Sequence, residues 1–290
     1  FGNAGEFLAA IGARVFKGEA YGLHTRVFIN SQGLPTYEAK ELGLEKLKME
    51  RFPDLSVMFI VTDNEITEYF KVLKKAMELV YPEIAAKLRH IPHGMMRLAT
   101  GKMSSRTGNV VTGESLIAGL SERAKERAKE SRADDIDMLA QQVAVAAIKY
   151  QVLKQAVGKD SIFDEERSLS IEGDSGPYVQ YAHARARAVL EKGEKEHIAP
   201  EAVVDGEPSL VERLIVRFPA VAERAQRDLS PHHVTGYVTE LASAFNSRYA
   251  KEQILDGTKD AARKLAIVAA TAATLKNGLH LLGIKAPEKM

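Results

Sequence analysis

The pattern of apolar and polar residues differs between the two parts of this chain. In residues 1–115, short apolar runs alternate with segments whose apolar residues recur at helical spacing. Residues 55–62 form a nearly continuous apolar run, which predicts a strand buried on both faces of a parallel sheet. Residues 26–30 predict another strand, and residues 65–80 predict a helix that stops at Pro82. This order of strands and helices predicts an α/β layer architecture.

After Glu114 the strand patterns disappear and helical patterns replace them. Residues 159–173 are polar and acidic and form a candidate connector. Ser175 is a suitable N-cap for the next helix, which has Pro177 in its first turn. The predicted helices span residues 116–131, residues 138–157 (ended by Gly158) and residues 175–192, followed by two helices separated near Pro219, and then residues 231–250 and 258–283. Such a series of helices predicts a helix bundle.

The composition narrows the function classes only slightly. The 290 residues are 45% hydrophobic and contain no cysteine, which excludes disulfides, thiolate zinc sites and a cysteine nucleophile. No apolar run reaches the roughly 20 residues that span a bilayer, so we expect a cytoplasmic protein without membrane contact. The formal net charge is +1, so any contact with nucleic acid must use local basic patches.

The segment 101–109, Gly101-Lys102-Met103-Ser104-Ser105-Arg106-Thr107-Gly108-Asn109, carries the strongest chemical signal. It holds two cations, three hydroxyls and two glycines, which are the groups that bind polyphosphate. It is not a P-loop, because Met103 follows Lys102 where a Ser or Thr would hold magnesium. Composition alone leaves open a solvated glycine- and serine-rich loop without a ligand.

The amino-acid sequence of this segment resembles a motif of a known family. Residues 102–106 resemble the second signature of class I aminoacyl-tRNA synthetases, Lys-Met-Ser-Lys-Ser, and the longer stretch is similar to the arginyl-tRNA synthetase branch. Four further stretches resemble the same branch, in the order that the family has them. They are residues 33–40 (GLPTYEAK), 175–183 (SGPYVQYAH), 244–247 (AFNS) and 282–290 (LGIKAPEKM).

The resemblance implies a fold and a division into domains. The fold class would be α/β plus all-α, with the second half of a Rossmann-type class I catalytic domain followed by a helical-bundle anticodon-binding domain. The catalytic part would span residues 1–135, a helical connection residues 136–174, and the anticodon-binding domain residues 175–290. The chain contains no His-x-Gly-His, the other class I signature, so we expect the C-terminal portion of a longer, monomeric enzyme.

The resemblance also implies which residues contact ATP. Lys102 would stabilise the departing pyrophosphate, together with Met103, Ser104, Ser105 and Arg106. Most class I enzymes have a second lysine where this chain has Ser105, which leaves the compensating charge open. Magnesium would arrive with ATP, and no protein-bound metal is expected. The residues expected near adenine are His90, His93, Gly94 and Met95.

Two further sets of residues would bind the other substrates. Tyr37 and Glu41 would hold the guanidinium of L-arginine, although the family usually has Asp where this chain has Glu41. Tyr178, Tyr181 and Arg185 fall at i, i+3 and i+7 of one helix and would stack on bases of tRNA(Arg). The resemblance adds Asn246, Tyr249 and Met290 to this RNA surface. Without it, both tyrosines could simply edge the core, and Tyr37 and Glu41 could lie on an ordinary surface helix.

The predicted function is the ATP-dependent ligation of L-arginine to its tRNA through an arginyl-adenylate. This chain alone would be inactive, because half of the ATP site would be missing. One alternative is a non-catalytic tRNA-binding module or a synthetase-like paralogue, which Ser105 and the missing histidine signature favour. Another is an unrelated nucleotide-binding α/β protein, which would leave Tyr178 and Tyr181 without a role.

Overall fold

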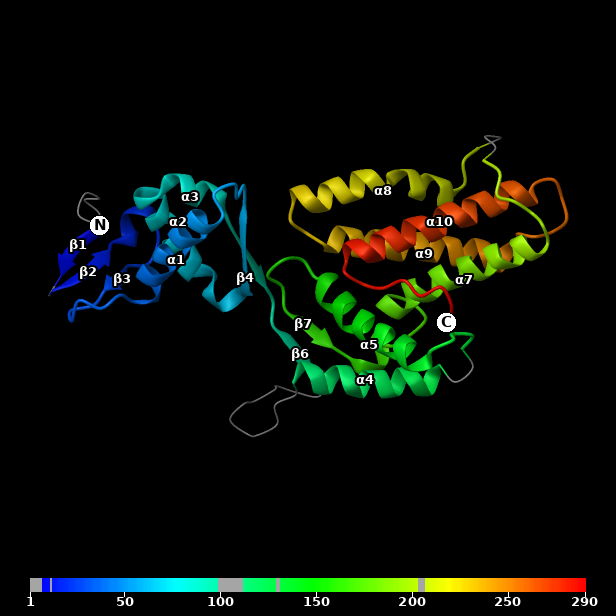
Figure 1. Cartoon of the computed structure of the whole chain (residues 1–290), viewed down its shortest axis with the longest axis horizontal. Helices are drawn as coiled ribbons and strands as arrows, with labels where there is room; N and C mark the ends of the chain where they lie inside the picture. The colour runs from blue at the N-terminus through cyan, green and yellow to red at the C-terminus, as the bar shows by residue number, and fades with distance from the viewer. Residues whose placement is uncertain (1–6, 11, 99–111, 129–130, 203–206) are drawn as a thin grey trace. The chain divides into compact units, whose positions relative to one another are not determined.

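The structure, a computed structural model, describes residues 7–10, 12–98, 112–128, 131–202 and 207–290 (Figure 1). Its contacts define two compact units that divide between Met95 and Met96, and residues 157–159 belong with the first unit. Each unit is described by itself. The domain boundaries expected at residues 135 and 174 follow the change of sequence pattern and stay a prediction.

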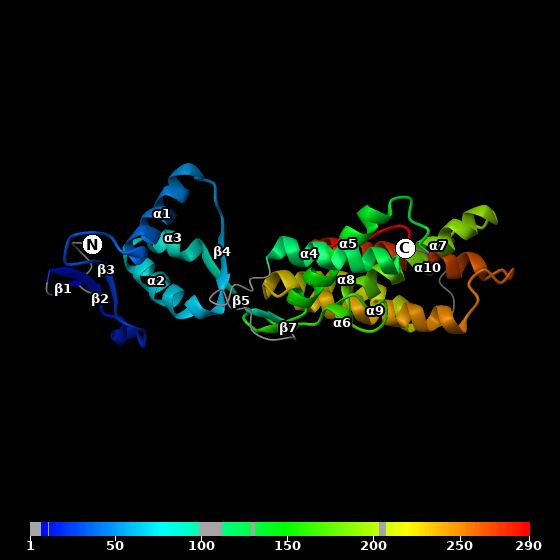
Figure 2. The ribbon, with the colours of Figure 1, turned by 90° about the horizontal axis from the view of Figure 1, so that it is seen from below.

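The first unit combines two small sheets with three helices. A three-stranded antiparallel sheet has the order β1-β2-β3, and β4 pairs with β5 in parallel. In both views the helices lie between the two sheets (Figures 1 and 2). The elements are β1 (Phe7–Ala10), β2 (Ala13–Phe16), β3 (Arg26–Ile29), α1 (Tyr37–Arg51), β4 (Met58–Asp63), α2 (Thr67–Val80), α3 (Pro82–Lys87) and β5 (Leu88–His93), with 3-10 helices at Gly18–Tyr21 and Asn64–Ile66. Their common core includes Phe16, Phe28, Leu42, Leu73, Met77 and Leu88.

The strand and helix predictions for this unit are largely confirmed. Residues 26–30 correspond to β3, and the helix expected at 65–80 is α2, although Pro82 also opens α3. The parallel strand is β4, but its predicted burial on both faces is wrong. Met58 is buried, whereas Phe59 is 50% and Val61 62% exposed. One face of β4 packs on the core of this unit, whereas the face with Phe59 and Val61 is at least half exposed.

The second unit is mainly helical. Its elements are β6 (Met96–Leu98), α4 (Gly113–Arg127), α5 (Ile136–Leu153), β7 (Ser161–Phe163), α6 (Glu165–Ser168), α7 (Gly176–Lys195), α8 (Leu210–Arg227), α9 (His232–Lys251) and α10 (Ala261–Leu281). The expectation that no strand follows Glu114 is wrong, because β7 pairs in parallel with β6. Three residues with buried Ser161 and Phe163 around exposed Ile162 are too short a run to stand out in the sequence.

The predicted break near Pro219 is also wrong, since α8 continues through it from Leu210 to Arg227. Proline removes a backbone donor inside a helix and clashes with the preceding turn, a cost of about 3 kcal/mol. Two features offset this cost. Ser209 and Glu212 form a capping box at the start of α8, and Val211 and Leu214 bury its apolar face.

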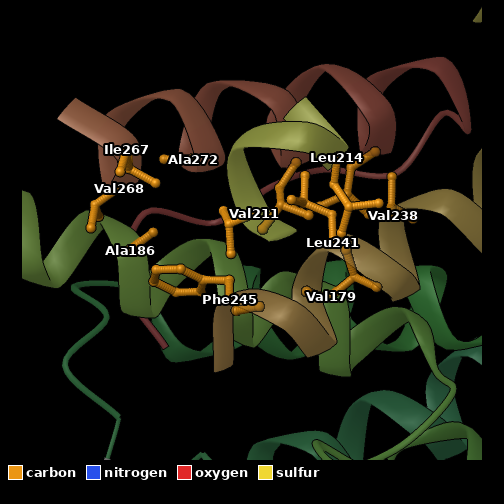
Figure 3. Packing of buried hydrophobic residues seen from close by; sticks show 14 of the residues in the cluster. Val179, Ala186, Val211, Leu214, Val238, Leu241, Phe245, Ile267, Val268 and Ala272 are labelled. Carbon is orange, nitrogen blue, oxygen red and sulfur yellow. The ribbon is translucent and has the colours of Figure 1, made fainter. Parts of the chain in front are cut away.

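The core of the second unit lies among α7, α8, α9 and α10 (Figure 3). Helix α7 begins where expected, because the Ser175 hydroxyl accepts the backbone N–H of Tyr178 at 3.0 Å. Its predicted apolar face is confirmed. The residues of that face, Val179, Ala182, Ala186 and Leu190, are all buried. Figure 3 shows Val179 and Ala186 facing Phe245 and its neighbours on the surrounding helices.

Gly176 provides a test of how closely α7 approaches α5. A Cβ atom placed on Gly176 would lie 2.4 Å from the carbonyl oxygen of Ala146. We predict that Gly176→Ala lowers the free energy of unfolding by about 1–3 kcal/mol, as other overpacked sites do. The measurement is urea unfolding followed by circular dichroism.

Gly236 on α9 is the matched control. It is exposed, and a Cβ there meets nothing within 4 Å. Gly236→Ala should therefore raise the free energy of unfolding by about 0.5–1 kcal/mol through helix propensity. Equal effects of the two substitutions would contradict the close contact.

Candidate functional site

The signature segment, residues 101–109, lies outside the described residues, and so do Lys102, Met103, Ser104, Ser105 and Arg106. The elements on either side are described. Strand β6 ends at Leu98, and α4 begins after Thr112, whose hydroxyl accepts the N–H of Ser115 at 3.1 Å. The roles assigned to the signature residues stay predictions.

The residues expected near adenine lie at the end of β5. The His90 ring stacks on Phe70 with centroids 4.0 Å apart, and its Nε2 lies 2.8 Å from the Thr62 hydroxyl. Burial lowers the pKa of His90. His93 is exposed, and its Nδ1 lies 3.0 Å from the carbonyl oxygen of Gly94. His90 therefore contributes to the interior of the first unit, whereas His93, Gly94 and Met95 follow it at the surface end of the strand.

The two residues expected to bind arginine lie one turn apart on α1. Tyr37 opens the helix and is 82% exposed. Glu41 is half-buried, and burial raises the pKa of its carboxyl, as does the nearby carboxylate of Glu45. Glu45 is fully buried and pairs with Lys48 at 2.5 Å. Tyr37 thus offers an open ring, and Glu41 a carboxyl whose charge is incompletely compensated.

A third carboxylate of α1 lies in the same group. Glu38 is buried and pairs with Arg26 of β3 at 3.5 Å. The Arg26 guanidinium also lies 5.7 Å from the ring centroid of Tyr69 on α2. Burial raises the pKa of Tyr69, and the charges of Glu41 and Glu38 raise it further. Sequence reasoning missed Glu38, Glu45 and Tyr69, because their role depends on how α1, β3 and α2 meet.

The residues expected to bind RNA come together from two helices of the second unit. The guanidinium of Arg185 on α7 lies 4.7 Å from the ring centroid of Tyr181 and 5.1 Å from that of Tyr249 on α9. Its Nη1 donates to the Asn246 side-chain oxygen at 2.5 Å. We call these four residues the aromatic cluster. Tyr178, by contrast, packs against the bundle core.

Tyr181 also lines a cavity of about 330 Å³ in the same unit. Met290 lies in its wall and packs against the apolar cluster of α4 and α5. The other lining residues are Ala124, Arg127, Ala128, Ser131, Leu139, Val143, Leu169 and Ile171. The cavity is mainly apolar and has Arg127, Ser131 and Tyr181 as polar groups, which suits a flat ring with polar edges.

Two buried polar residues of α7 hold the segment that carries Met290. Gln180 donates from Nε2 to the carbonyl oxygen of Lys285 at 2.7 Å. His183 Nδ1 lies 2.9 Å from the carbonyl oxygen of Pro287, so this nitrogen carries the proton. Both side chains are almost fully buried. Polar residues at i and i+3 on the core face were the sequence signal for this contact, which sequence reasoning missed.

Three comparisons relate this geometry to known proteins. Residues 9–165 match the family "tRNA synthetases class I (R), catalytic domain", and residues 179–290 match the DALR anticodon binding domain. An arginine–tRNA ligase of Streptococcus pneumoniae serotype 19F (strain G54) is 33% identical over 291 residues, which cover 99% of this chain and 52% of that protein.

Two solved structures share the fold. Thermus thermophilus arginyl-tRNA synthetase has a TM-score of 0.82 and 26% identity, with 96% of this chain and 54% of that chain covered. The Plasmodium falciparum arginyl-tRNA synthetase has a TM-score of 0.78 and 21% identity, with 100% and 51% covered, and supports the fold alone. The chain therefore spans about half the length of these relatives.

These matches confirm the predicted fold class: part of a class I aminoacyl-tRNA synthetase catalytic domain followed by a helical anticodon-binding domain. Within that class, the catalytic-domain match covers more than half of the chain and is specific to one branch. The chain belongs to the arginyl-tRNA synthetase family.

Two further properties concern the described residues only. None of the helices in this part of the chain is long and apolar enough to cross a membrane. Within the same residues, His, Asp and Glu side chains form no group of three or more that could hold a metal ion.

The contact between His183 and Pro287 predicts a pH dependence. Burial lowers the pKa of His183, and its Nε2 has no hydrogen-bond partner among the described residues. Because the unfolded state takes up the proton at higher pH than the folded state, stability is greatest above about pH 6.5 and falls as the pH drops. His183→Ala should lower the free energy of unfolding by about 1–3 kcal/mol at pH 7. Between pH 7 and pH 5, the free energy of unfolding should fall less in this variant than in wild type.

Urea unfolding at several pH values measures both effects. His280→Ala on α10 is the control, since His280 is exposed and its replacement should change stability by less than about 0.5 kcal/mol. An unchanged pH profile in His183→Ala would show that the pKa of His183 is the same in the folded and unfolded states, and would contradict the prediction.

Proposed function

We propose that this chain is the C-terminal portion of an enzyme that ligates L-arginine to tRNA(Arg), using ATP with magnesium on its phosphates. The aromatic cluster beside the apolar cavity is the observation that carries the RNA-binding half of this proposal. The catalytic half rests on the family match and on the signature segment. Because the chain spans about half the length of its relatives, the complete reaction belongs to the longer protein.

The first reaction would form an arginyl-adenylate. A carboxylate oxygen of arginine attacks the α-phosphorus of ATP, and the bond to the bridging oxygen breaks as pyrophosphate leaves. Negative charge then builds up on the departing phosphates, and preorganised cations and donors lower the barrier. Lys102 would supply the charge, and Ser104 and Ser105 would donate hydrogen bonds. The arginine carboxylate is already ionised at neutral pH, so no protein base is required.

The acidic face of α1 supports a guanidinium as the bound group. Glu41 is half-buried with a raised pKa, so a cation beside it would stabilise its ionised form. The open ring of Tyr37 would cover the guanidinium plane. Glu38 is already paired with Arg26, which leaves Glu41 as the carboxylate available to the ligand. This side chain is one methylene longer than the usual Asp of the family.

The second unit would bind the anticodon region of the tRNA. Unpaired bases stack on aromatic side chains and on guanidinium planes. Tyr181 and Tyr249 provide two aromatic rings, and Arg185 provides a guanidinium plane. Asn246 fixes the guanidinium beside the two rings. The cavity that Tyr181 and Met290 line would receive a base turned out of the loop. Tyr178 would support this surface from the core side.

A second function remains supported by one residue. Ser105 stands where most class I enzymes have a catalytic lysine, which favours a non-catalytic tRNA-binding paralogue. Such a protein would keep the aromatic cluster and lose adenylate formation. The two candidates differ in one reaction, arginine-dependent ATP–pyrophosphate exchange.

We predict that Lys102→Ala slows adenylate formation by about 10²–10³-fold in the protein extended to the length of its relatives. The affinity for arginine should hardly change, because the lost contact is to phosphate. Steady-state ATP–pyrophosphate exchange measures the rate of adenylate formation. The 290-residue chain alone should show no exchange.

Lys87→Ala serves as the control for this rate, because it removes an equal charge at the end of α3. Equal rates in wild type and Lys102→Ala would remove the signature segment from the mechanism. An extended protein that binds tRNA without any exchange would support the paralogue.

We also predict that Tyr181→Ala and Tyr249→Ala each weaken binding of an RNA hairpin carrying the anticodon arm of tRNA(Arg). Loss of one stacked base is worth about 1–3 kcal/mol. The measurement is fluorescence anisotropy with the 290-residue chain. Val216→Ala, which removes an exposed apolar side chain from α8, should leave the affinity unchanged. Unaltered binding in folded tyrosine variants would mean that the rings only edge the core.

A further inference from the structure

A basic groove lies beside the aromatic cluster in the second unit. Its volume is about 690 Å³. Its walls come from the last turns of α7, from the end of α9 with the segment that follows it, and from Arg132 ahead of α5. Tyr249 belongs both to this groove and to the aromatic cluster. The groove therefore continues the proposed RNA-binding surface.

The charges around this groove are unevenly compensated. Four cations line it, namely Arg132, Lys192, Lys195 and Lys251, against two carboxylates, Glu191 and Glu252. Among the described residues, Arg132 and Lys251 form no ion pair. The groove therefore presents an excess of positive charge although the chain as a whole is nearly neutral.

Both carboxylates of the groove are paired with cations. Glu252 pairs with Arg248 at 2.7 Å and with Lys264 at 3.1 Å, and neither of these lines the groove. Glu191 pairs with Lys195 at 2.7 Å. The Lys192 side chain is 63% exposed and only loosely paired with Glu196, at 3.6 Å. Lys192, Lys251 and Arg132 are thus the cations open to an anionic ligand.

The sequence of α7 connects the aromatic cluster to the groove. Tyr181, Arg185, Lys192 and Lys195 follow one another at spacings of four, seven and three residues, which place them on one side of the helix. Lys251 follows Tyr249 at the end of α9. The surface therefore changes from aromatic to basic along the same direction on both helices.

We propose that this groove binds the phosphate backbone of the RNA strand whose bases stack on the aromatic cluster. The proposal rests on the tRNA-binding function and extends it by assigning a path to the backbone. A single strand requires stacking surfaces for its bases and a row of cations for its phosphates. Tyr249 lies where the two surfaces meet, because it lines the groove and its ring also contacts Arg185.

The salt dependence of binding tests this assignment directly. Each phosphate contact of a single strand contributes about 0.7 to the slope of log affinity against log salt. The variant Lys192→Gln with Lys251→Gln removes two charges and keeps a polar side chain at both positions. We expect the slope to be smaller by about 1.4 in this variant. Its affinity at 0.1 M salt should be about 25-fold lower than that of wild type, and the two affinities should converge near 1 M salt.

The experiment uses the 290-residue chain and the anticodon-arm hairpin, by fluorescence anisotropy from 0.05 to 1 M salt. Arg213→Gln with Arg217→Gln is the control, because this variant also removes two positive charges. Both arginines are exposed on α8 and line neither the groove nor the cavity. Circular dichroism shows that both variants are folded. A polyglutamate peptide is the competing polyanion.

The possible outcomes are distinct. A reduced slope in the lysine variant with an unchanged slope in the control supports the groove. Equal slopes, or equal losses in both variants, overturn it while leaving base stacking intact. If the lysine variant loses binding of polyglutamate but keeps the RNA affinity of wild type, the proposal is overturned in favour of an acidic protein partner. Absence of any hairpin binding by wild type would overturn the proposed RNA function itself.

Discussion

The second unit depends on the close contact between the start of α7 and α5. Gly176 leaves no room for a side chain against the Ala146 carbonyl, and Ser175 fixes the first turn. Once this end is fixed, the rotation of α7 about its axis is fixed too. Val179 and Ala186 must then face the bundle, which leaves Tyr181 and Arg185 on the surface. A backbone contact thus determines which residues of α7 belong to the proposed RNA surface.

The first unit has a different organising constraint, which is negative charge on one helix. Three glutamates occupy successive turns of α1, and two of them are buried. Burying a carboxylate is costly unless a cation compensates it. Arg26 compensates Glu38, and Lys48 compensates Glu45. Glu41 lies between them and is the one of the three that forms no ion pair with a described residue.

The sequence predicts the elements with strong periodicity and misses features that depend on context. Ser175, Pro177 and the small apolar residues of α7 predicted its start and buried face correctly, because capping and burial are local properties. The capping box at Ser209 and the burial of Val211 and Leu214 together offset the cost of Pro219, so the expected break does not occur. Strand β7 is too short to show a pattern, and the burial of β4 depends on which elements cover it.

In the candidate site, too, the sequence predicted some residues and missed others. The sequence assigned six residues to one RNA surface: Tyr178, Tyr181, Arg185, Asn246, Tyr249 and Met290. Four of them form the aromatic cluster, whereas Tyr178 packs against the bundle core and Met290 lines the cavity. Gln180 and His183 could not be assigned from the sequence, since their partners are backbone carbonyls of a distant segment. Polar residues on a core face carry no local indication of what they bind.

The position of Arg185 has a consequence for the thermodynamics of recognition. A free arginine side chain loses up to about 2 kcal/mol of conformational entropy when it is immobilised. In this structure two tyrosine rings and the Asn246 amide already restrict the guanidinium. That entropy is lost when the protein folds, not when the ligand arrives. Association at this point should therefore proceed as the docking of rigid surfaces, with little induced ordering of the protein.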